Sequence, residues 1–265
     1  MREERGDAVE VAEVDQLGVP VDERADRFDV VGEHAIMLAR AAVGSRPMAE
    51  PAAVAFDLDG VLIESEQVWD AAREELVRER GGSWDDRATR DMMGMSSKEW
   101  ARYMHDRLRV PMGPDEINAD VVRQVAAAYR EHLPLLPDAV DTVRELAGRW
   151  PLGVASSANR EIIELVLELA GLADCFAAVV SSEEVERGKP APDVYLAVAR
   201  QMGVDPAACA AVEDSTNGIR AALAAGMRTI AVPNRQFPPD GEVLASATAV
   251  VPSLAEVTSD LVAGL

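Results

Sequence analysis

Two aspartates stand one residue apart in the segment AVAFDLDGVLIESE, residues 53–66. The apolar run in front of them predicts a buried strand at 53–57, and side chains along a strand alternate with a period of two. Asp57 and Asp59 are therefore expected on the same side, where two carboxylates repel each other and raise the pKa of one of them unless a cation lies between. The pair predicts a metal site or a catalytic role.

Polar residues also end or follow three further predicted strands. Ligands of parallel sheets bind at the carboxyl ends of the strands, so these residues are expected to converge on one site. The candidates are Ser156 and Ser157 after the strand at 151–156, Lys189 in the loop after the strand at 176–181, and Glu213 and Asp214 at the end of the strand at 209–214. Carboxylates, hydroxyls and one ammonium group at successive strand ends together indicate one functional site.

Strands and helices alternate along the second half of the chain, which predicts an α/β fold, a Rossmann-like parallel sheet with helices on both faces. An all-helical stretch follows the first strand and predicts an inserted cap domain. We expect an N-terminal extension at 1–48, an α/β core at 49–63 and 136–265, and a helical cap at 64–135. The expected strands lie at 53–57, 151–156, 176–181, 209–214 and 228–233, and the expected core helices at 138–149, 159–172, 192–203 and 217–227.

Residues 1–48 carry no motif and show little apolar periodicity. Their composition predicts a disordered or loosely attached extension. The stretch at 28–44 is compatible with one helix, and Met48 is a candidate start of the protein, since the first strand begins shortly after it.

Composition limits the partners of the chain. A net charge of −21 argues against nucleic acid. There is no run of about 18 apolar residues, so no membrane-spanning helix is expected, and the N-terminus lacks the apolar core of a signal peptide. Cys175 and Cys209 lack metal or redox spacing and are expected to be reduced. These features predict a cytoplasmic protein with no membrane partner, a monomer or weak homodimer.

Four segments in chain order resemble the motifs of one enzyme family. FDLDGV, ASSAN, GKPAPD and VEDSTNGIRAALAAGM are similar to the four motifs of the haloacid dehalogenase superfamily of phosphohydrolases, and the resemblance covers residues 53–250. Within that superfamily the sequence resembles the branch of β-phosphoglucomutases and small sugar-phosphate phosphatases with a helical type 1 cap. The resemblance implies a small phosphorylated metabolite as substrate and Mg²⁺ as cofactor.

The resemblance also implies roles for the acidic residues. Asp57 would be the nucleophile that forms an aspartyl-phosphate, and Asp59 would be the general acid and afterwards the general base. Mg²⁺ would be held by the Asp57 carboxylate, the Asp59 main-chain carbonyl and the Asp214 carboxylate. Glu213 would orient the groups around the metal rather than bind it.

The same resemblance implies three phosphate-binding residues. Lys189 would neutralise the aspartyl group and the phosphate, and Ser156 would donate a hydrogen bond to a phosphate oxygen, with Ser157 beside it. Gly60 would let the backbone turn tightly against the phosphate.

The cap is expected to select the substrate, because it closes over the site. Lys98 and Arg102 are candidates for contact with an anionic or hydroxylated substrate. Trp69 stands where the resembling mutases carry His and some hexose-phosphate phosphatases carry Trp, which favours a phosphatase. Alternatives are a β-phosphoglucomutase-like phosphosugar mutase and a non-catalytic phosphometabolite-binding protein. A phosphonoacetaldehyde hydrolase, with Lys98 as its Schiff base, or a dehalogenase fits the presence of Asp59 less well.

Overall fold

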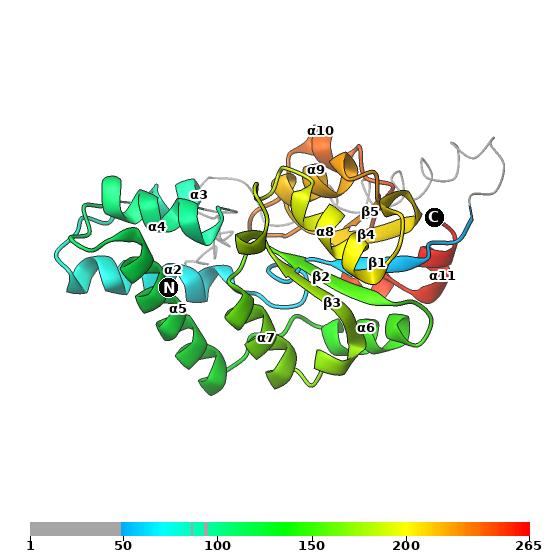
Figure 1. Cartoon of the computed structure of the whole chain (residues 1–265), viewed down its shortest axis with the longest axis horizontal. Coiled ribbons are helices and arrows are strands. Elements are labelled where there is room, and N and C mark those ends of the chain that lie inside the picture. Colours follow the sequence, from blue (N-terminus) through cyan, green and yellow to red (C-terminus); the bar gives the residue numbers. More distant parts are fainter. Residues whose placement is uncertain (1–48, 86, 93–94) are drawn as a thin grey trace, which may run out of the picture. The chain divides into compact units, whose positions relative to one another are not determined.

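The computed structural model describes residues 49–85, 87–92 and 95–265, which belong to one compact unit. Its centre is a six-stranded parallel sheet with the strand order β3-β2-β1-β4-β5-β6 (Figure 1). This confirms the predicted α/β fold and its five predicted strands, and adds a short edge strand, β6, that the sequence pattern did not indicate. The strands are Ala53–Phe56 (β1), Leu152–Ser156 (β2), Phe176–Ser181 (β3), Cys209–Glu213 (β4), Arg228–Ala231 (β5) and Ala249–Val250 (β6).

Helices cover both faces of the sheet because successive residues of its strands point in opposite directions. In β1, Val54 and Phe56 belong to a core shared with α6, α7 and α11, whereas Ala53 and Ala55 belong to a second core shared with α8 and α9. The core helices are Ala139–Ala147 (α6), Arg160–Leu169 (α7), Asp193–Met202 (α8), Thr216–Ala224 (α9), Gly241–Leu244 (α10) and Ser259–Ala263 (α11). Short 3₁₀ turns lie at Ala173–Cys175, Ser182–Glu184, Pro206–Ala208 and Leu254–Glu256.

Four helices between β1 and α6 pack on one another, and we call them the cap helices (cyan to green in Figure 1). Their shared interior holds Leu76, Trp100, Met104 and Val121, all buried. The Glu99 carboxylate accepts the main-chain N–H of Ser96 at 2.8 Å and so fixes the start of α4. The cap helices are Glu66–Glu79 (α2), Ala88–Met92 (α3), Ser97–Asp106 (α4) and Pro114–Glu131 (α5).

The chain enters and leaves the cap helices through two segments that pair with each other. The N–H of Glu64 donates to the carbonyl of Pro134 at 2.8 Å, and the N–H of Leu136 donates to the carbonyl of Leu62 at 3.0 Å. A cap domain at 64–135 stays a prediction, and this paired crossing supports its two boundaries. Of the other expected segments, 1–48 with its helix at 28–44 lies outside the described residues.

The turn after β1 corrects one part of the sequence argument. The strand ends at Phe56, and the Leu58 carbonyl accepts the N–H groups of the next turn, including that of Leu62 at 2.8 Å. Asp59 therefore lies in a turn and not in the strand, so the period of two does not relate it to Asp57. Their relation has to come from the observed contacts.

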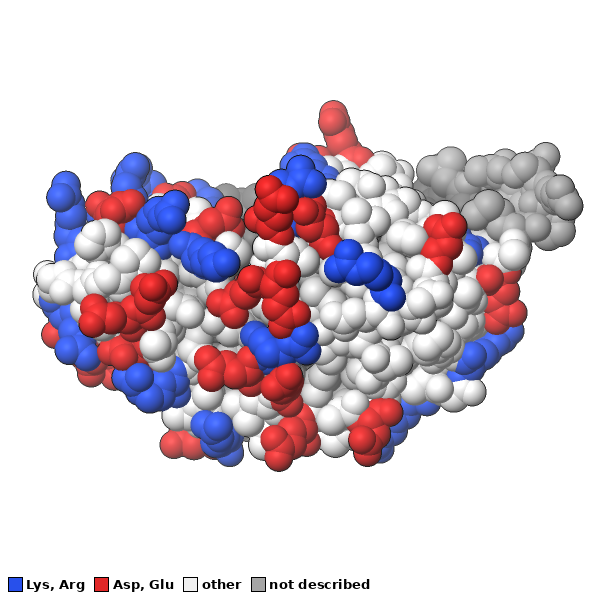
Figure 2. Space-filling view, in the orientation of Figure 1, with Lys and Arg blue, Asp and Glu red and all other residues white. Residues whose placement is uncertain are grey.

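Both cysteines are free thiols, with Cys209 buried. On the face shown in Figure 2, acidic and basic side chains are interspersed. Within the described ranges, no helix has the length and apolar character needed to cross a bilayer.

Candidate active site

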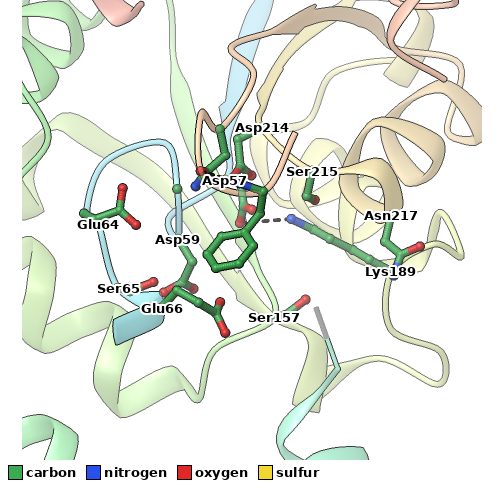
Figure 3. A pocket seen from close by; sticks show the side chains of 13 residues that line it. Asp57, Asp59, Glu64, Ser65, Glu66, Ser157, Lys189, Asp214, Ser215 and Asn217 are labelled. Atoms are coloured by element: carbon green, nitrogen blue, oxygen red, sulfur yellow. Dashed lines mark hydrogen bonds and ion pairs between the residues drawn. The ribbon is translucent and has the colours of Figure 1, made fainter. Parts of the chain in front are cut away.

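Four charged side chains meet at the carboxyl edge of the sheet, and we call them the sheet-edge cluster: Asp57, Lys189, Glu213 and Asp214. β1 and β4 are neighbouring parallel strands, so the residues at their ends lie side by side. Lys189 reaches the same place from the loop between β3 and α8. Its Nζ lies 2.9 Å from Asp57 Oδ1 and 2.6 Å from Glu213 Oε1, and the first of these pairs is drawn in Figure 3.

Glu213 is completely buried and uses both carboxylate oxygens within the protein. Oε1 accepts hydrogen bonds from Lys189 Nζ and from the Tyr195 hydroxyl at 2.7 Å, and Oε2 accepts the Asp214 main-chain N–H at 3.1 Å. Gly218 makes room for this carboxylate, because a Cβ there would lie 1.9 Å from both oxygens. Glu213 therefore orients the ammonium group of Lys189.

Asp57 has one carboxylate oxygen held and the other directed to the pocket. Oδ1 accepts the Leu58 N–H at 2.8 Å as well as the contact from Lys189, while Oδ2 has no hydrogen-bond partner among the described residues. Burial raises the pKa of Asp57 to about 8, although Lys189 opposes the shift. A further positive charge near Asp57 would therefore favour its ionised, nucleophilic form.

Burial alone would lower the pKa of Lys189, but the carboxylates of Asp57 and Glu213 outweigh this effect and hold the pKa above its usual value. Lys189 is 8% exposed and lies 5.2 Å from the centre of the Tyr195 ring. The ammonium group is thus kept charged at a fixed place beside the Asp57 carboxylate.

The donor set of the cluster fits a hard divalent cation. Oxygens of Asp57, Glu213 and Asp214 lie within 4.8 Å of one another, and three carboxylates stand against one ammonium. Burial and the neighbouring Glu213 raise the pKa of Asp214 well above its usual value, a charge conflict that a cation relieves. Because the oxygens of Glu213 are already used, Asp57 and Asp214 are the carboxylates left for the metal.

Gly60 closes this site from the turn after β1. It has a φ of +77°, and a Cβ on it would lie 2.0 Å from Asp214 Oδ2. The sequence argument assigned its small size to the approach of a phosphate. The structure shows that it also accommodates the Asp214 carboxylate.

Asp59 lies beside the sheet-edge cluster and outside the group of three carboxylates that could share a metal. Its Oδ2 accepts a hydrogen bond from the Ser156 hydroxyl at 3.2 Å, and its Oδ1 is buried with no hydrogen-bond partner among the described residues. Ser156 is completely buried and also accepts the Ala158 N–H at 3.0 Å. The Asp59 carboxylate is thus oriented by a neighbour and keeps one oxygen free.

A pocket of about 100 Å³ opens over the cluster (Figure 3). Of the residues expected at the site, six line it, Gly60 included, while Ser156 and Glu213 lie next to it. Sequence reasoning missed the others, although Ser65 and Glu66 are in the quoted segment and Asn234 follows a predicted strand end. The lining residues are Asp57, Asp59, Gly60, Glu64, Ser65, Glu66, Ser157, Lys189, Asp214, Ser215, Asn217, Asn234 and Phe237.

A second pocket, of about 70 Å³, adjoins the first under the cap helices, and we call it the cap pocket. Of the three cap residues expected to select the substrate, Trp69 lines it. Lys98 and Arg102 are exposed and line neither pocket. The lining residues are Asp59, Ser65, Glu66, Trp69, Arg73, Met95, Trp100, Ser157 and Ala158.

Known proteins resemble this chain over the region that carries the site. The family profile of haloacid dehalogenase-like hydrolases matches residues 51–226. Hexitol phosphatase B of Escherichia coli is 36% identical over 185 residues, which cover 68% of this chain and 83% of that protein. The crystal structure of CbbY from Rhodobacter sphaeroides in complex with phosphate aligns with a TM-score of 0.73 at 26% identity, covering 81% of this chain and all of that one.

A longer relative matches over part of its length. The bifunctional riboflavin kinase/FMN phosphatase of Arabidopsis thaliana is 32% identical over 206 residues, which cover 77% of this chain, and the match spans 54% of the plant protein. The family match itself extends over most of the described residues and includes β1 and β4, the strands that Asp57 and Asp214 follow. This chain belongs to the haloacid dehalogenase-like hydrolases.

Proposed function

We propose that this hydrolase is a Mg²⁺-dependent phosphatase of a small phosphomonoester, a sugar phosphate or a similar metabolite, and that it acts through an aspartyl-phosphate on Asp57. The observation that carries the proposal is the sheet-edge cluster, in which Asp57 keeps one oxygen free beside Lys189 at the floor of a pocket. The names of relatives such as hexitol phosphatase B agree with a phosphorylated polyol or sugar as substrate.

In the first step, Asp57 Oδ2 attacks phosphorus. The new bond joins Oδ2 to phosphorus, and the bond between phosphorus and the ester oxygen breaks. Asp59 gives its proton to that oxygen, which leaves as an alcohol. Lys189 offsets the negative charge of the phosphoryl group during the transfer.

In the second step, the ionised Asp59 takes a proton from a water molecule whose oxygen attacks the same phosphorus. The bond between phosphorus and Asp57 breaks, inorganic phosphate leaves, and Asp59 is again protonated. The Ser156 hydroxyl, which donates to Asp59 Oδ2, keeps this carboxyl group in one orientation through both steps.

Mg²⁺ would be held by the carboxylates of Asp57 and Asp214 and by the main-chain carbonyl of Asp59. When bound, it supplies positive charge that keeps Asp57 ionised and offsets the charge of the phosphoryl oxygens. Ser157, which lines the pocket, and Lys189 are proposed to bind those oxygens. Ser156, the third expected phosphate ligand, lies behind Asp59 and donates its one hydroxyl hydrogen to Asp59 Oδ2.

A phosphosugar mutase is the second candidate. The reverse of the first step would transfer the phosphoryl group from phosphorylated Asp57 to a free hydroxyl of a sugar phosphate, and the first step on the resulting bisphosphate would return the other phosphoryl group to Asp57 and release the isomer. The buried Trp69 in the cap pocket favours the phosphatase, because an indole ring does not exchange protons as an imidazole does. A non-catalytic phosphometabolite-binding protein would retain the pocket without turnover.

To test the proposal, phosphate release is measured from about one hundred small phosphorylated metabolites, the class of ligand that such a pocket admits. Each is assayed with and without Mg²⁺. We expect release that requires Mg²⁺ and stops in excess chelator. Full activity in chelator contradicts the metal role. Conversion of a sugar phosphate to its isomer without net release of phosphate identifies a mutase.

A further inference from the structure

The cap pocket contains a buried arginine that the catalytic steps do not use. Arg73, on α2, is 6% exposed. Its Nη1 lies 3.4 Å from Asp70 Oδ1 and 3.9 Å from Glu66 Oε1, so its charge is already shared with two carboxylates. Burial lowers the pKa of Arg73 and the two carboxylates oppose the shift, and the side chain stays a cation.

Two polar atoms beside this pocket lack partners. Arg73 Nε, a donor, and Glu66 Oε1, an acceptor, are both buried without a hydrogen-bond partner in the described part of the chain. Buried polar atoms of folded proteins are nearly always paired, so an unpaired donor and an unpaired acceptor at one pocket call for a water molecule or a ligand there. A hydroxyl group donates one hydrogen bond and accepts others, and it therefore satisfies both atoms.

Two aromatic rings contact the arginine. The ring centres of Trp69 on α2 and Trp100 on α4 are 6.0 Å apart, and the Arg73 guanidinium lies 5.4 Å and 5.2 Å from them. These two cation–π contacts orient the guanidinium. The rings also offer apolar faces to the C–H groups of a carbon chain, as small-molecule sites with a few placed polar groups commonly do.

The cap pocket is joined to the reacting atoms. It shares Asp59, Ser65, Glu66 and Ser157 with the pocket over the sheet-edge cluster. Asp59 is the residue proposed to protonate the leaving oxygen. The group attached to that oxygen, the alcohol part of the substrate, therefore extends toward Glu66 and Arg73.

We infer that the cap pocket binds the alcohol part of the substrate as an uncharged polyol, with hydroxyl groups between Glu66 Oε1 and Arg73 Nε, and that it disfavours substrates with a second phosphate or a carboxylate. The inference rests on the proposed phosphatase function and adds a substrate class to it. At pH 8, where the assay is run and Glu66 is ionised, a second anion would meet the charge of Glu66. Arg73, the one cation among the described residues that line the cap pocket, is already paired.

The test compares kcat/KM for three esters: fructose 1-phosphate, fructose 1,6-bisphosphate and 4-nitrophenyl phosphate, which has no hydroxyl groups on its leaving group. We expect the wild-type protein to prefer the monophosphate over the bisphosphate by at least about tenfold. Glu66→Gln should lower kcat/KM for fructose 1-phosphate by about tenfold or more and leave 4-nitrophenyl phosphate within about twofold. The preference over the bisphosphate should shrink in the same variant.

Two further variants separate recognition from folding. Arg73→Lys keeps the charge but lacks the Nε donor, and it should lower activity on fructose 1-phosphate and spare 4-nitrophenyl phosphate. Glu79→Gln, at the exposed end of the same helix, is the matched control and should behave as wild type. Equal turnover of the monophosphate and the bisphosphate by wild type overturns the inference. So does a loss in Glu66→Gln that is the same for the sugar and the aryl ester.

Absence of turnover with all three esters, the aryl ester included, overturns the proposed phosphatase and leaves the cap pocket to a binding measurement. Calorimetric titration of wild type and Glu66→Gln with the two fructose phosphates then decides. Tighter binding of the monophosphate that weakens in the variant supports the polyol site, and equal binding of both esters overturns it.

Discussion

The sheet-edge cluster and the cap pocket both hold a buried cation among carboxylates, but they differ in how their polar atoms are paired. In the cluster, Lys189 contacts two carboxylates and Glu213 has both oxygens occupied. In the cap pocket, Arg73 Nε and Glu66 Oε1 have no partners within the described residues. In the first arrangement Lys189 and Glu213 are held in fixed pairs and Asp57 and Asp214 are left for a metal ion, whereas in the second the unpaired atoms are left for a ligand.

The two regions also differ in how the backbone positions them. Strand ends of a parallel sheet lie at one edge, so the cluster follows from topology. The cap pocket depends on which faces of α2 and α4 meet. Variants that affect one region and spare the other test this division of roles between chemistry and selectivity.

The largest expected difference in activity is between substitutions of Asp57 and Asp59, the two aspartates of the segment FDLDGV. Asp57→Asn removes the nucleophile, so turnover should vanish. Asp59→Asn keeps the nucleophile and the main-chain carbonyl and loses proton transfer, which is worth about 10²–10⁴-fold. Acetyl phosphate has a good leaving group and should still phosphorylate Asp57 in Asp59→Asn, and the adduct should then accumulate because its hydrolysis lacks a base.

Intact-mass measurement after acetyl phosphate treatment checks this. One added phosphoryl group is expected on Asp59→Asn, with Asp57→Asn as the control that stays unmodified. Equal labelling of the two variants, or wild-type turnover by either, would show that their roles are assigned wrongly.

The next largest effect concerns the approach of Gly60 to Asp214. A methyl group on Gly60 meets Asp214 Oδ2 at 2.0 Å, whereas Gly81 has a similar φ of +73° and nothing within 4 Å of the added atom. Both Ala variants carry the same backbone strain, but only Gly60→Ala displaces a proposed metal ligand. We expect Gly60→Ala to lose about 100-fold in activity, because displacing a group of the active site by about 1 Å costs roughly this much.

Titration of activity with Mg²⁺ distinguishes the cause. Gly60→Ala should require much more Mg²⁺ for half-maximal activity, and Gly81→Ala should match wild type in Mg²⁺ requirement. If both variants lose activity equally, backbone strain and not the contact with Asp214 explains the result.

The sequence predicted the cluster better than the cap pocket for a physical reason. Apolar runs that end in Asp57, Glu213 or Asp214 mark strand ends, and a parallel sheet brings such ends together whatever the loops do. Ser156 was also placed at its strand end, with its hydroxyl on Asp59. Two residues form β6, which is too short a pattern to recognise.

In the cap, sequence reasoning did not indicate the buried cation. Lys98 and Arg102 are exposed and line neither pocket, and their contact with substrate stays a prediction. The cation that lines the cap pocket is Arg73, on the buried face of α2. Charged residues in amphipathic helices usually face solvent. Only the folded structure shows that Arg73 contacts both Trp69 of α2 and Trp100 of α4.

A smaller effect is expected where the two regions are bridged. Glu183, in the 3₁₀ turn after β3, accepts hydrogen bonds from the Ser97 hydroxyl of α4 and from Asn159 Nδ2 at 2.8 Å. Asn159 also donates to Asn118 of α5 at 3.2 Å. Glu183→Ala removes a charged acceptor shared by cap and core, and we expect it to lower the free energy of unfolding by about 3 kcal/mol.

The neighbouring glutamate is the control. Glu184 forms an ion pair with Arg160 in which both side chains are about one third exposed, and exposed pairs contribute less than about 1 kcal/mol. Urea denaturation of the Glu183→Ala and Glu184→Ala variants compares the two. Equal losses would argue against a stabilising bridge between cap and core.

The smallest effect follows from the cap pocket itself and depends on pH. Burial raises the pKa of Glu66 from 4.5 to about 7, with Arg73 opposing and Asp70, Asp59 and Glu64 reinforcing the shift. The folded protein therefore binds a proton at Glu66 that the unfolded chain releases between these two values, and stability falls as the pH rises through this window.

Glu66→Gln lacks this loss, so its free energy of unfolding relative to wild type should rise by on the order of 2 kcal/mol between pH 5 and 8. Urea denaturation across this range, with Glu79→Gln as control, measures it. A residue kept at such a cost in stability but needed for polyol recognition fits a binding role, whereas a difference that stays constant with pH would mean that Glu66 is solvated and the cap pocket is not built around it.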